Sequence, residues 1–259
     1  MGTVPLYMRD ERNQSRLNGS HRSLREADMT TTTITAGDGG SFSAYVAMPT
    51  RLTAPAVVVI QEIFGVNQVM RDLTDAYAKA GYIAICPDIF WRIEPGVDIT
   101  DKSEADWQKA FELFGKFDVD AGVEDLKATL AYARGISGCT GRAGSVGYCL
   151  GGKLAYLMAT RSESDANVSF YGVGMDELLD EASNITKPYV SHIAAKDGFV
   201  PPEAQAKILP VFEAHPLITP YVYAGQDHAF AREGGEHFDA AAAELANRRT
   251  QDFFTQHLS

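Results

Sequence analysis

The stretch Ser145-Val146-Gly147-Tyr148-Cys149-Leu150-Gly151-Gly152 has the form G-x-C-x-G. It follows an apolar run that predicts a strand and precedes a helical pattern. In the related pattern G-x-S-x-G, the small flanking residues permit a sharp strand-to-helix turn that exposes a nucleophile. A thiol at this turn lies at the positive end of the helix, which favours the thiolate, and the backbone N–H of Leu150 faces a developing oxyanion. The stretch predicts a nucleophile, and a buried structural cysteine is the alternative.

Strand and helix signals alternate on both sides of this turn. Strands are predicted at 34–36, 42–47, 56–60, 82–86, 143–148, 168–171, 189–194 and 219–223, and helices at 68–80, 102–114, 119–134, 150–160, 205–214 and 236–257. Glycines at 37–40 predict a hairpin between the first two strands. The alternation predicts an α/β fold with a mostly parallel central sheet and helices on both faces. We expect one domain over residues 29–259.

Residues 1–28 differ from the rest of the chain. They hold five arginines and four acidic residues without sustained hydrophobic periodicity, and they lack the apolar core of a secretory signal. We interpret them as a polar extension, either added to the natural protein or translated from an upstream start codon. We expect this extension to be disordered. A genuine N-terminal arm is the alternative.

The composition argues against several classes of protein. The 259 residues carry 23 basic and 34 acidic side chains, a net charge of −11, which disfavours a nucleic-acid partner. No apolar run approaches the roughly 20 residues that span a membrane. The three cysteines show no C-x-x-C pair, which argues against a disulfide framework, a metal site or a redox motif. We expect a cytoplasmic protein without metal or cofactor, as a monomer or weak homodimer. Cys86 is expected in the core and Cys139 in a turn-like loop.

A nucleophilic thiol needs a base, and the base needs an orienting acid. His228 follows a late predicted strand and so lies at the carboxyl edge of the sheet, where ligands bind in open α/β folds. His192 lies inside an apolar strand and is expected to pack in the core. Asp197 occupies a loop like that of His228, whereas Asp227 is its direct neighbour and points away from it. We therefore favour Asp197, and the order Cys149, Asp197, His228 is that of α/β-hydrolase triads.

Four motifs resemble those of the dienelactone hydrolase (carboxymethylenebutenolide hydrolase) family. They are Gln61-Glu62-Ile63-Phe64-Gly65-Val66-Asn67, Cys86-Pro87-Asp88, Val146 to Gly152 and Asp227-His228-Ala229-Phe230-Ala231-Arg232. The likeness extends over roughly residues 32–258. It implies an α/β-hydrolase fold and hydrolysis of a small enol-lactone in aromatic-ring degradation.

The resemblance also implies roles for single residues. Cys149 is the nucleophile, His228 the base and Asp197 its partner. Glu62 pairs with the resting thiol and helps to form the thiolate when substrate binds, and the backbone N–H of Ile63 is a second oxyanion donor. Arg232 is one of two arginines that hold the substrate carboxylate.

The chain departs from the family where the second arginine is expected, because Trp107 stands there. Phe111 and Phe114 replace a tyrosine and a tryptophan of the family. These three residues also share one helix face, as core-packing residues do. Since a charge-assisted contact is worth roughly 1.5–3 kcal/mol, its loss predicts a bulkier or less charged ester or lactone.

Three other functions remain open at this point. A broad carboxylesterase uses the same machinery on aryl esters, and a non-catalytic binding protein would keep Arg232 and the aromatic residues while Cys149 is silent. A thiol redox sensor needs a resolving cysteine, and none is evident. Amides are poor candidates because a poor leaving group favours expulsion of the thiolate.

Overall fold

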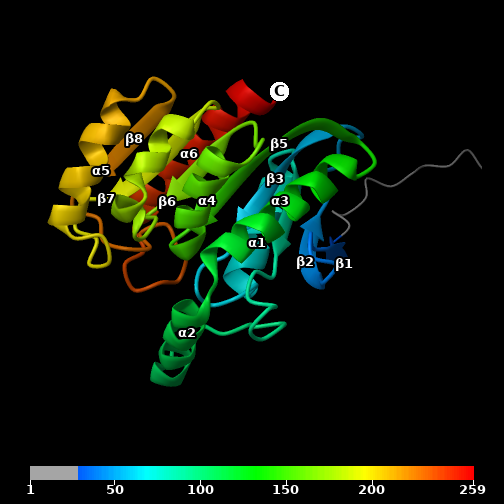
Figure 1. The fold of residues 1–259 in the computed structure, drawn as a ribbon, viewed down its shortest axis with the longest axis horizontal. Helices are drawn as coiled ribbons and strands as arrows, with labels where there is room; N and C mark the ends of the chain where they lie inside the picture. Colours follow the sequence, from blue (N-terminus) through cyan, green and yellow to red (C-terminus); the bar gives the residue numbers. More distant parts are fainter. Residues whose placement is uncertain (1–28) are drawn as a thin grey trace, which may run out of the picture.

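The computed structural model describes residues 29–259, which form an eight-stranded sheet with helices on both faces (Figure 1). The strands are β1 (Met29–Thr35), β2 (Ser41–Ala47), β3 (Ala54–Ile60), β4 (Ile83–Pro87), β5 (Cys139–Tyr148), β6 (Asn167–Phe170), β7 (Tyr189–Ala194) and β8 (Ile218–Tyr223). Their order is β1-β2-β4-β3-β5-β6-β7-β8. Pairing is antiparallel from β1 to β4 and parallel from β4 to β8. The predicted α/β-hydrolase architecture is confirmed.

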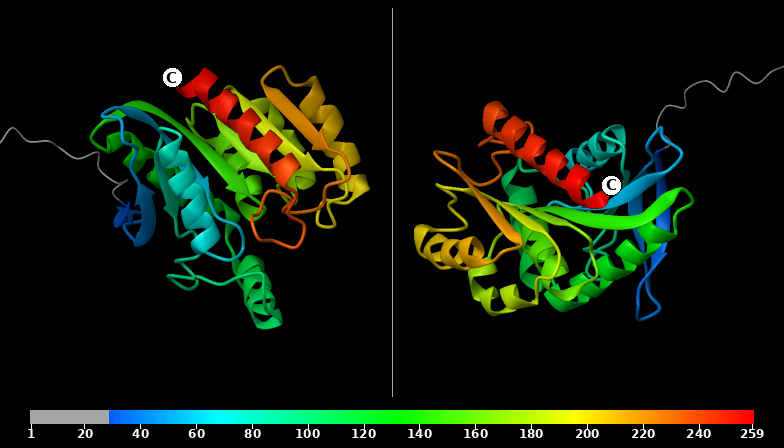
Figure 2. Two further views of the ribbon diagram at one scale, coloured as in Figure 1. Left: turned by 180° about the vertical axis from the view of Figure 1, so that it is seen from behind. Right: turned by 90° about the horizontal axis from the view of Figure 1, so that it is seen from above.

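Residues 29–259 form six α-helices. They are α1 (Gln68–Lys79), α2 (Glu104–Lys116), α3 (Val119–Gly135), α4 (Leu150–Arg161), α5 (Pro202–Ala214) and α6 (Ala240–Leu258), with two short 3-10 helices, η1 (Met175–Glu177) and η2 (Leu179–Asn184), after β6. Figure 2 shows α1 and α6 on one face of the sheet and α3, α4 and α5 on the other. Helix α2 projects away from the body of the molecule (Figure 1).

The central strands are buried because both of their faces are covered. Every residue of β3, β4, β6 and β7 is buried, as expected of parallel strands between two helix layers. Cys86, on β4, belongs to this core as predicted, and burial raises the pKa of its thiol to about 12. The predicted core position of His192 is also confirmed, because its ring is buried between Tyr223 and Thr250.

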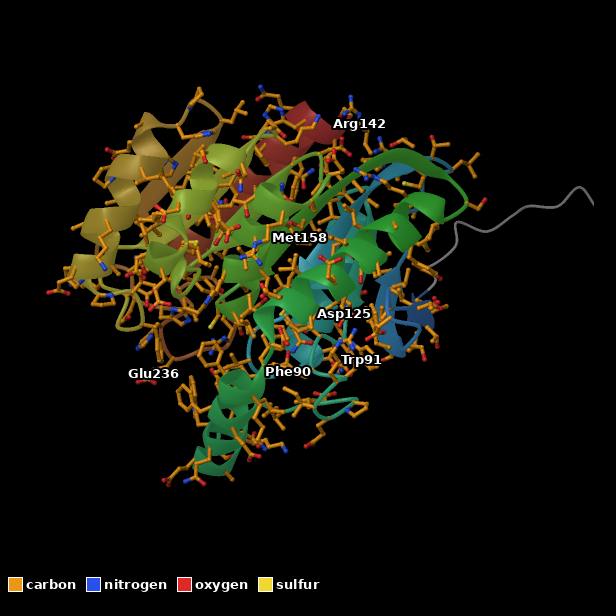
Figure 3. All side chains as sticks on the ribbon, viewed as in Figure 1. Phe90, Trp91, Asp125, Arg142, Met158 and Glu236 are labelled. Atoms are coloured by element: carbon orange, nitrogen blue, oxygen red, sulfur yellow. The ribbon has the colours of Figure 1, made fainter. Side chains whose placement is uncertain are left out.

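Local contacts fix the path of the chain between β4 and α3. Asp125 on α3 accepts hydrogen bonds from Nε1 of Trp91 at 2.8 Å and from Nε and Nη2 of Arg92 at 2.9 and 2.8 Å. Figure 3 labels Trp91 and Asp125 close together. The side chains of Ser103 and Asp118 cap the first turns of α2 and α3. Trp107 on α2 packs edge-on against Phe64, which follows β3, so α2 lies beside the carboxyl end of that strand.

Several expected boundaries are wrong, and each has a local cause. Cys139 begins β5 instead of lying in a turn, because it pairs with Ala54 of β3. Helix α6 begins at Ala240 rather than at residue 236, because the Asp239 carboxylate caps it by accepting the N–H of Ala242 at 2.8 Å. Strand β1 reaches back to Met29 because the threonine run pairs with β2. The predicted extension at 1–28 lies outside the described residues.

Candidate active site

Cys149 lies at the turn between β5 and α4 in a strained backbone conformation. Its φ is 56° and its ψ is −114°, and it is the residue immediately before the first turn of α4. Non-glycine residues adopt such a conformation only where the surrounding structure enforces it. A Cβ built on Gly147 would lie 1.8 Å from the carbonyl oxygen of Gly151, and one built on Gly151 would lie 2.3 Å from that of Ile60. The two glycines of the motif are therefore required for the turn to close.

His228 and Asp197 come together from the loops after β8 and β7. Nδ1 of His228 lies 2.9 Å from Oδ2 and 3.0 Å from Oδ1 of Asp197, and both side chains are buried. The Asp197 carboxylate also accepts the N–H groups of Phe199 and Val200, at 2.9 and 3.2 Å. These bonds hold the carboxylate still, and the carboxylate in turn orients the imidazole.

The other ring nitrogen of His228, Nε2, forms no hydrogen bond with Asp197. Nε2 is buried and has no hydrogen-bond partner within residues 29–259. Burial opposes protonation of the ring, but the negative charge of Cys149 and the hydrogen bond to Asp197 outweigh it and raise the pKa of His228 to about 10. The contacts of His228 with Cys149 and Asp197 therefore favour the protonated ring.

Asp227, the alternative acid, serves the backbone instead. Its Oδ1 accepts the N–H of His228 at 2.7 Å and the N–H of Gly198 at 3.1 Å. These contacts tie the loop after β8 to the loop after β7. Asp227 thus helps to place His228 without touching its ring.

Cys149 and His228 line a cavity of about 420 Å³ with a largely aromatic wall. Phe64, Trp107, Phe111, Phe114 and Phe199 form this wall, and Ile63, Lys153, Val173, Gly174, Glu177 and Arg232 complete the lining. Trp107 stacks on Phe111 with ring centroids 5.5 Å apart and meets Phe64 edge-on at 5.0 Å. Phe111 and Phe114 keep 48% and 39% of their surface exposed, so they face the cavity rather than the core. A larger groove of about 700 Å³ lies between α1 and α6 and contains none of the predicted site residues.

Arg232 and Glu62 form a buried ion pair at the edge of this cavity. Nε of Arg232 donates to Oε2 of Glu62 at 2.8 Å, and Nη2 donates to Oε1 at 3.1 Å. Nη1 donates to Asp101 at 3.0 Å, so each nitrogen of the guanidinium binds a carboxylate. This arrangement differs from the pairing of Glu62 with the thiol that the resemblance implies. It raises the pKa of Arg232 further above its usual value, against the effect of burial.

The two expected oxyanion donors lie on opposite sides of Cys149 along the chain. Leu150 is the first residue of α4, and N–H groups of a first helical turn have no partner within their helix. Ile63 follows β3 and borders the cavity. Leu150 directly follows Cys149, which lines the same cavity.

Lys153 and Asp101 belong to the site, and the sequence motifs do not identify them. Lys153 lies in the first turn of α4, four residues after Cys149, a closeness in sequence that could have pointed to it. Asp101 precedes α2 and reaches Arg232 across 131 positions of sequence, and no local signal marks it.

Two structural tests concern other kinds of protein. Within residues 29–259, no group of three or more histidine, cysteine, aspartate or glutamate side chains is arranged to hold a metal ion. No helix in that part of the chain is long and apolar enough to cross a membrane.

Comparison with known proteins identifies the family. Residues 42–258 match the model of the dienelactone hydrolase family. A carboxymethylenebutenolidase of Pseudomonas putida is 40% identical over 220 residues, which cover 85% of this chain and 93% of the relative. A protein of Azospirillum brasilense, provisionally named a carboxymethylenebutenolidase, is 55% identical over 236 residues, which cover 89% of this chain and all of the relative.

A solved structure agrees with these relatives. A crystal structure from Klebsiella pneumoniae, provisionally named a dienelactone hydrolase, superposes with a TM-score of 0.78 at 26% identity, and the match covers 90% of this chain and 100% of that one. The family model and the relatives each cover most of the chain. The chain therefore belongs to the dienelactone hydrolase family.

Proposed function

We propose that the protein hydrolyses a small lactone or ester, with Cys149 as nucleophile, His228 as proton carrier and Asp197 as the residue that orients His228. The main support is the geometry of His228. Its Nδ1 binds Asp197, while its buried Nε2 lacks a partner in residues 29–259 and the ring borders the same cavity as Cys149. Acyl transfer to a thiolate requires a histidine with one ring nitrogen held by an acid and the other free to carry a proton.

The reaction proceeds in two stages. The Cys149 thiolate attacks the carbonyl carbon, and the N–H groups of Ile63 and Leu150 stabilise the oxyanion, each donor being worth roughly 10²–10³ in rate. The C–O bond of the lactone breaks, and the departing enol oxygen takes the proton of the His228 imidazolium. Water then attacks the thioester, His228 accepts its proton, and the thiolate leaves. An enol is a good leaving group, which suits a cysteine nucleophile.

Glu62 and Arg232 act at the edge of this reaction. Arg232 is a substrate-binding residue, but a substrate carboxylate reaches its guanidinium in a bidentate manner only by displacing Glu62 or Asp101. A displaced Glu62 provides a free carboxylate that takes up the Cys149 proton whenever the thiol, rather than His228, carries it. Binding of an anionic substrate thereby favours the thiolate form of the nucleophile.

Trp107, Phe111 and Phe114 form the part of the cavity that selects the substrate. Two of them are more than a third exposed, and all three line the cavity, so apolar area is available to an acyl or leaving group. Burying that area contributes about 25 cal/mol per Å². We propose that this wall accepts a bulkier substrate than a pocket with an arginine at position 107.

A panel of substrates tests this function. An enol-lactone, an aryl ester and the matching aryl amide are offered to the wild type, to Cys149→Ala and to Cys139→Ser, which changes a cysteine outside the cavity. We expect the wild type and Cys139→Ser to hydrolyse the lactone and the ester but not the amide, and Cys149→Ala to lose at least about 10³-fold in kcat. Cys149→Ala retaining a tenth of the activity would refute the nucleophile.

The aromatic wall favours one second function, a broad carboxylesterase on the same machinery. It differs in preferring aryl esters to lactones. The ratio of kcat/KM for the ester and the lactone separates the two. A protein that binds the lactone without turning it over would instead be a ligand-binding member of the family.

A further inference from the structure

Lys153 brings a positive charge into the cavity from the side of the nucleophile. It lies on α4, where residues four apart share a helix face, and its N–H donates to the carbonyl oxygen of Cys149 at 3.2 Å. Its half-buried side chain lines the same cavity as Cys149 and His228. The general motif of the turn does not require a lysine at this position.

The ammonium group of Lys153 lies against the loop that follows β6. A Cβ built on Gly174 would be 3.4 Å from its Nζ, and Gly174 has a φ of +63°. Gly174 and Val173 both line the cavity. Because Gly174 has no side chain, the ammonium group of Lys153 can lie close to the backbone along the cavity wall.

The lining of this cavity contains one lysine, Lys153, and one arginine, Arg232. The two side chains differ in the ion pairs that they form. All three nitrogens of Arg232 bind the carboxylates of Glu62 and Asp101. Lys153 forms no ion pair with any residue of the described part of the chain, although the exposed Glu177 borders the same cavity. Of these two side chains, Lys153 is the one whose charge is not already bound to a carboxylate within residues 29–259.

We propose that Lys153 binds a carboxylate of the substrate and determines the preference of the enzyme for anionic substrates. This inference rests on the proposed hydrolysis. A partly desolvated ammonium beside an aromatic wall attracts an anion more strongly than one in water does. Lys153 can do so without breaking an existing ion pair, whereas Arg232 must first lose one. Helix α2 has Trp107 where the family has an arginine, and Lys153 on α4 supplies a positive charge instead. This charge favours a substrate with one carboxylate over a neutral substrate.

The first experiment compares a carboxymethylene enol-lactone with its primary carboxamide, which has the same shape and no charge. The variants are Lys153→Met, Lys153→Arg and Lys127→Met, a control on α3 whose lysine pairs with Glu124 outside the cavity. We expect Lys153→Met to lower kcat/KM about 10- to 100-fold for the acid, mainly through KM, and less than about twofold for the amide. Lys153→Arg should keep the preference, and Lys127→Met should behave as the wild type. Equal losses on both substrates would overturn the proposal.

A second experiment does not depend on hydrolysis. Alkylation of Cys149 by iodoacetate and by iodoacetamide is compared in the wild type and in Lys153→Met. We expect the iodoacetate-to-iodoacetamide rate ratio to fall about 10-fold in the variant, and an unchanged ratio would overturn the anion site. If the ratio falls but the wild type hydrolyses neither lactone, the anion site stands and the proposed hydrolysis fails. If both lactones are hydrolysed and Lys153→Met leaves their relative rates unchanged, the hydrolysis stands and the anion site fails.

Discussion

Glu62 and Arg232 are 170 positions apart in the sequence and form a two-point ion pair, with N–O distances of 2.8 and 3.1 Å. Glu62 follows β3 and Arg232 follows β8, so the ion pair links the loop after β3 to the loop after β8. Both side chains are buried. A buried charge is tolerated only with its partner, which gives the pair a structural role in addition to any role in catalysis.

Removing one member of this pair is expected to destabilise the fold. Arg232→Met leaves the Glu62 carboxylate buried without its partner and should lower the free energy of unfolding by about 3–5 kcal/mol, measured by urea denaturation. Adding Glu62→Gln should recover part of the loss. Arg142→Met serves as the control, because that arginine is exposed and its pairing with Asp165 is worth less than about 1 kcal/mol. Equal stability of Arg232→Met and Arg142→Met would contradict this account of the pair.

The orientation of His228 is expected to depend on Asp197 and not on Asp227. In Asp197→Asn the partner of Nδ1 loses its charge and presents either an amide oxygen or an amide nitrogen, so the correct ring state is no longer enforced. We expect kcat to fall about 10²–10⁴-fold. Asp227→Asn keeps an oxygen that accepts the backbone N–H groups, so its kcat should fall less than about tenfold. Similar kcat values in the two variants would mean that the acid is misassigned.

The protonation of His228 gives a prediction about pH. Its pKa is raised to about 10, with burial opposing and Cys149 and Asp197 favouring the charged ring. Because this pKa lies above the value of 6.5 in the unfolded chain, the charged ring stabilises the fold below pH 6.5, and that contribution is lost as the pH rises through about 10. Nitrogen NMR of the imidazole should show the titration in that range.

Cys149→Ala provides the control for this pH effect. Without the thiolate, one of the two favourable charges is gone, so the pKa of His228 should fall. The decrease of the unfolding free energy between pH 7 and pH 10 should then be shallower than in the wild type. An imidazole that titrates at the same pH in both proteins would show that Cys149 does not carry the charge.

Two glycines offer a matched test of the turn. Gly147→Ala places a methyl group 1.8 Å from the carbonyl oxygen of Gly151, and this contact cannot be relieved without opening the turn. We expect loss of activity together with destabilisation of several kcal/mol. Gly115→Ala, on α2, meets nothing within 4 Å and should stabilise the protein by about 0.5–1 kcal/mol. Thermal unfolding of both variants checks the contrast, and a soluble, active Gly147→Ala would show that the turn tolerates a side chain.

Local patterns in the sequence account for most of the fold. The apolar run of β3 and the turn at Cys149 predict their own structure, because burial on both faces and a sharp turn select residue types within a few positions. Boundaries were less predictable. The strand at Cys139 exists because β3 lies beside it, and nothing within the turn-like stretch itself indicates that pairing.

The site was predictable in its parts but not in its contacts. Glycine spacing and chain order point to Cys149, Asp197 and His228. The partner of Glu62 and the role of Asp101 depend on side chains that folding brings together from more than 130 positions away. Lys153 lies about one helical turn from Cys149. Its significance depends on the lack of an ion pair within residues 29–259 and on the contact with Gly174, which only the folded chain reveals.

The central claim is that Cys149 forms a covalent thioester with the acyl group of the substrate. The most direct test is rapid acid quenching of the wild type during turnover of a slowly deacylated aryl ester, followed by intact-mass and peptide-mass measurement. The account predicts a mass increase equal to the acyl group, located on Cys149, which forms and decays at rates compatible with kcat. Turnover without an adduct, or an adduct on another residue that explains the rate, would contradict it.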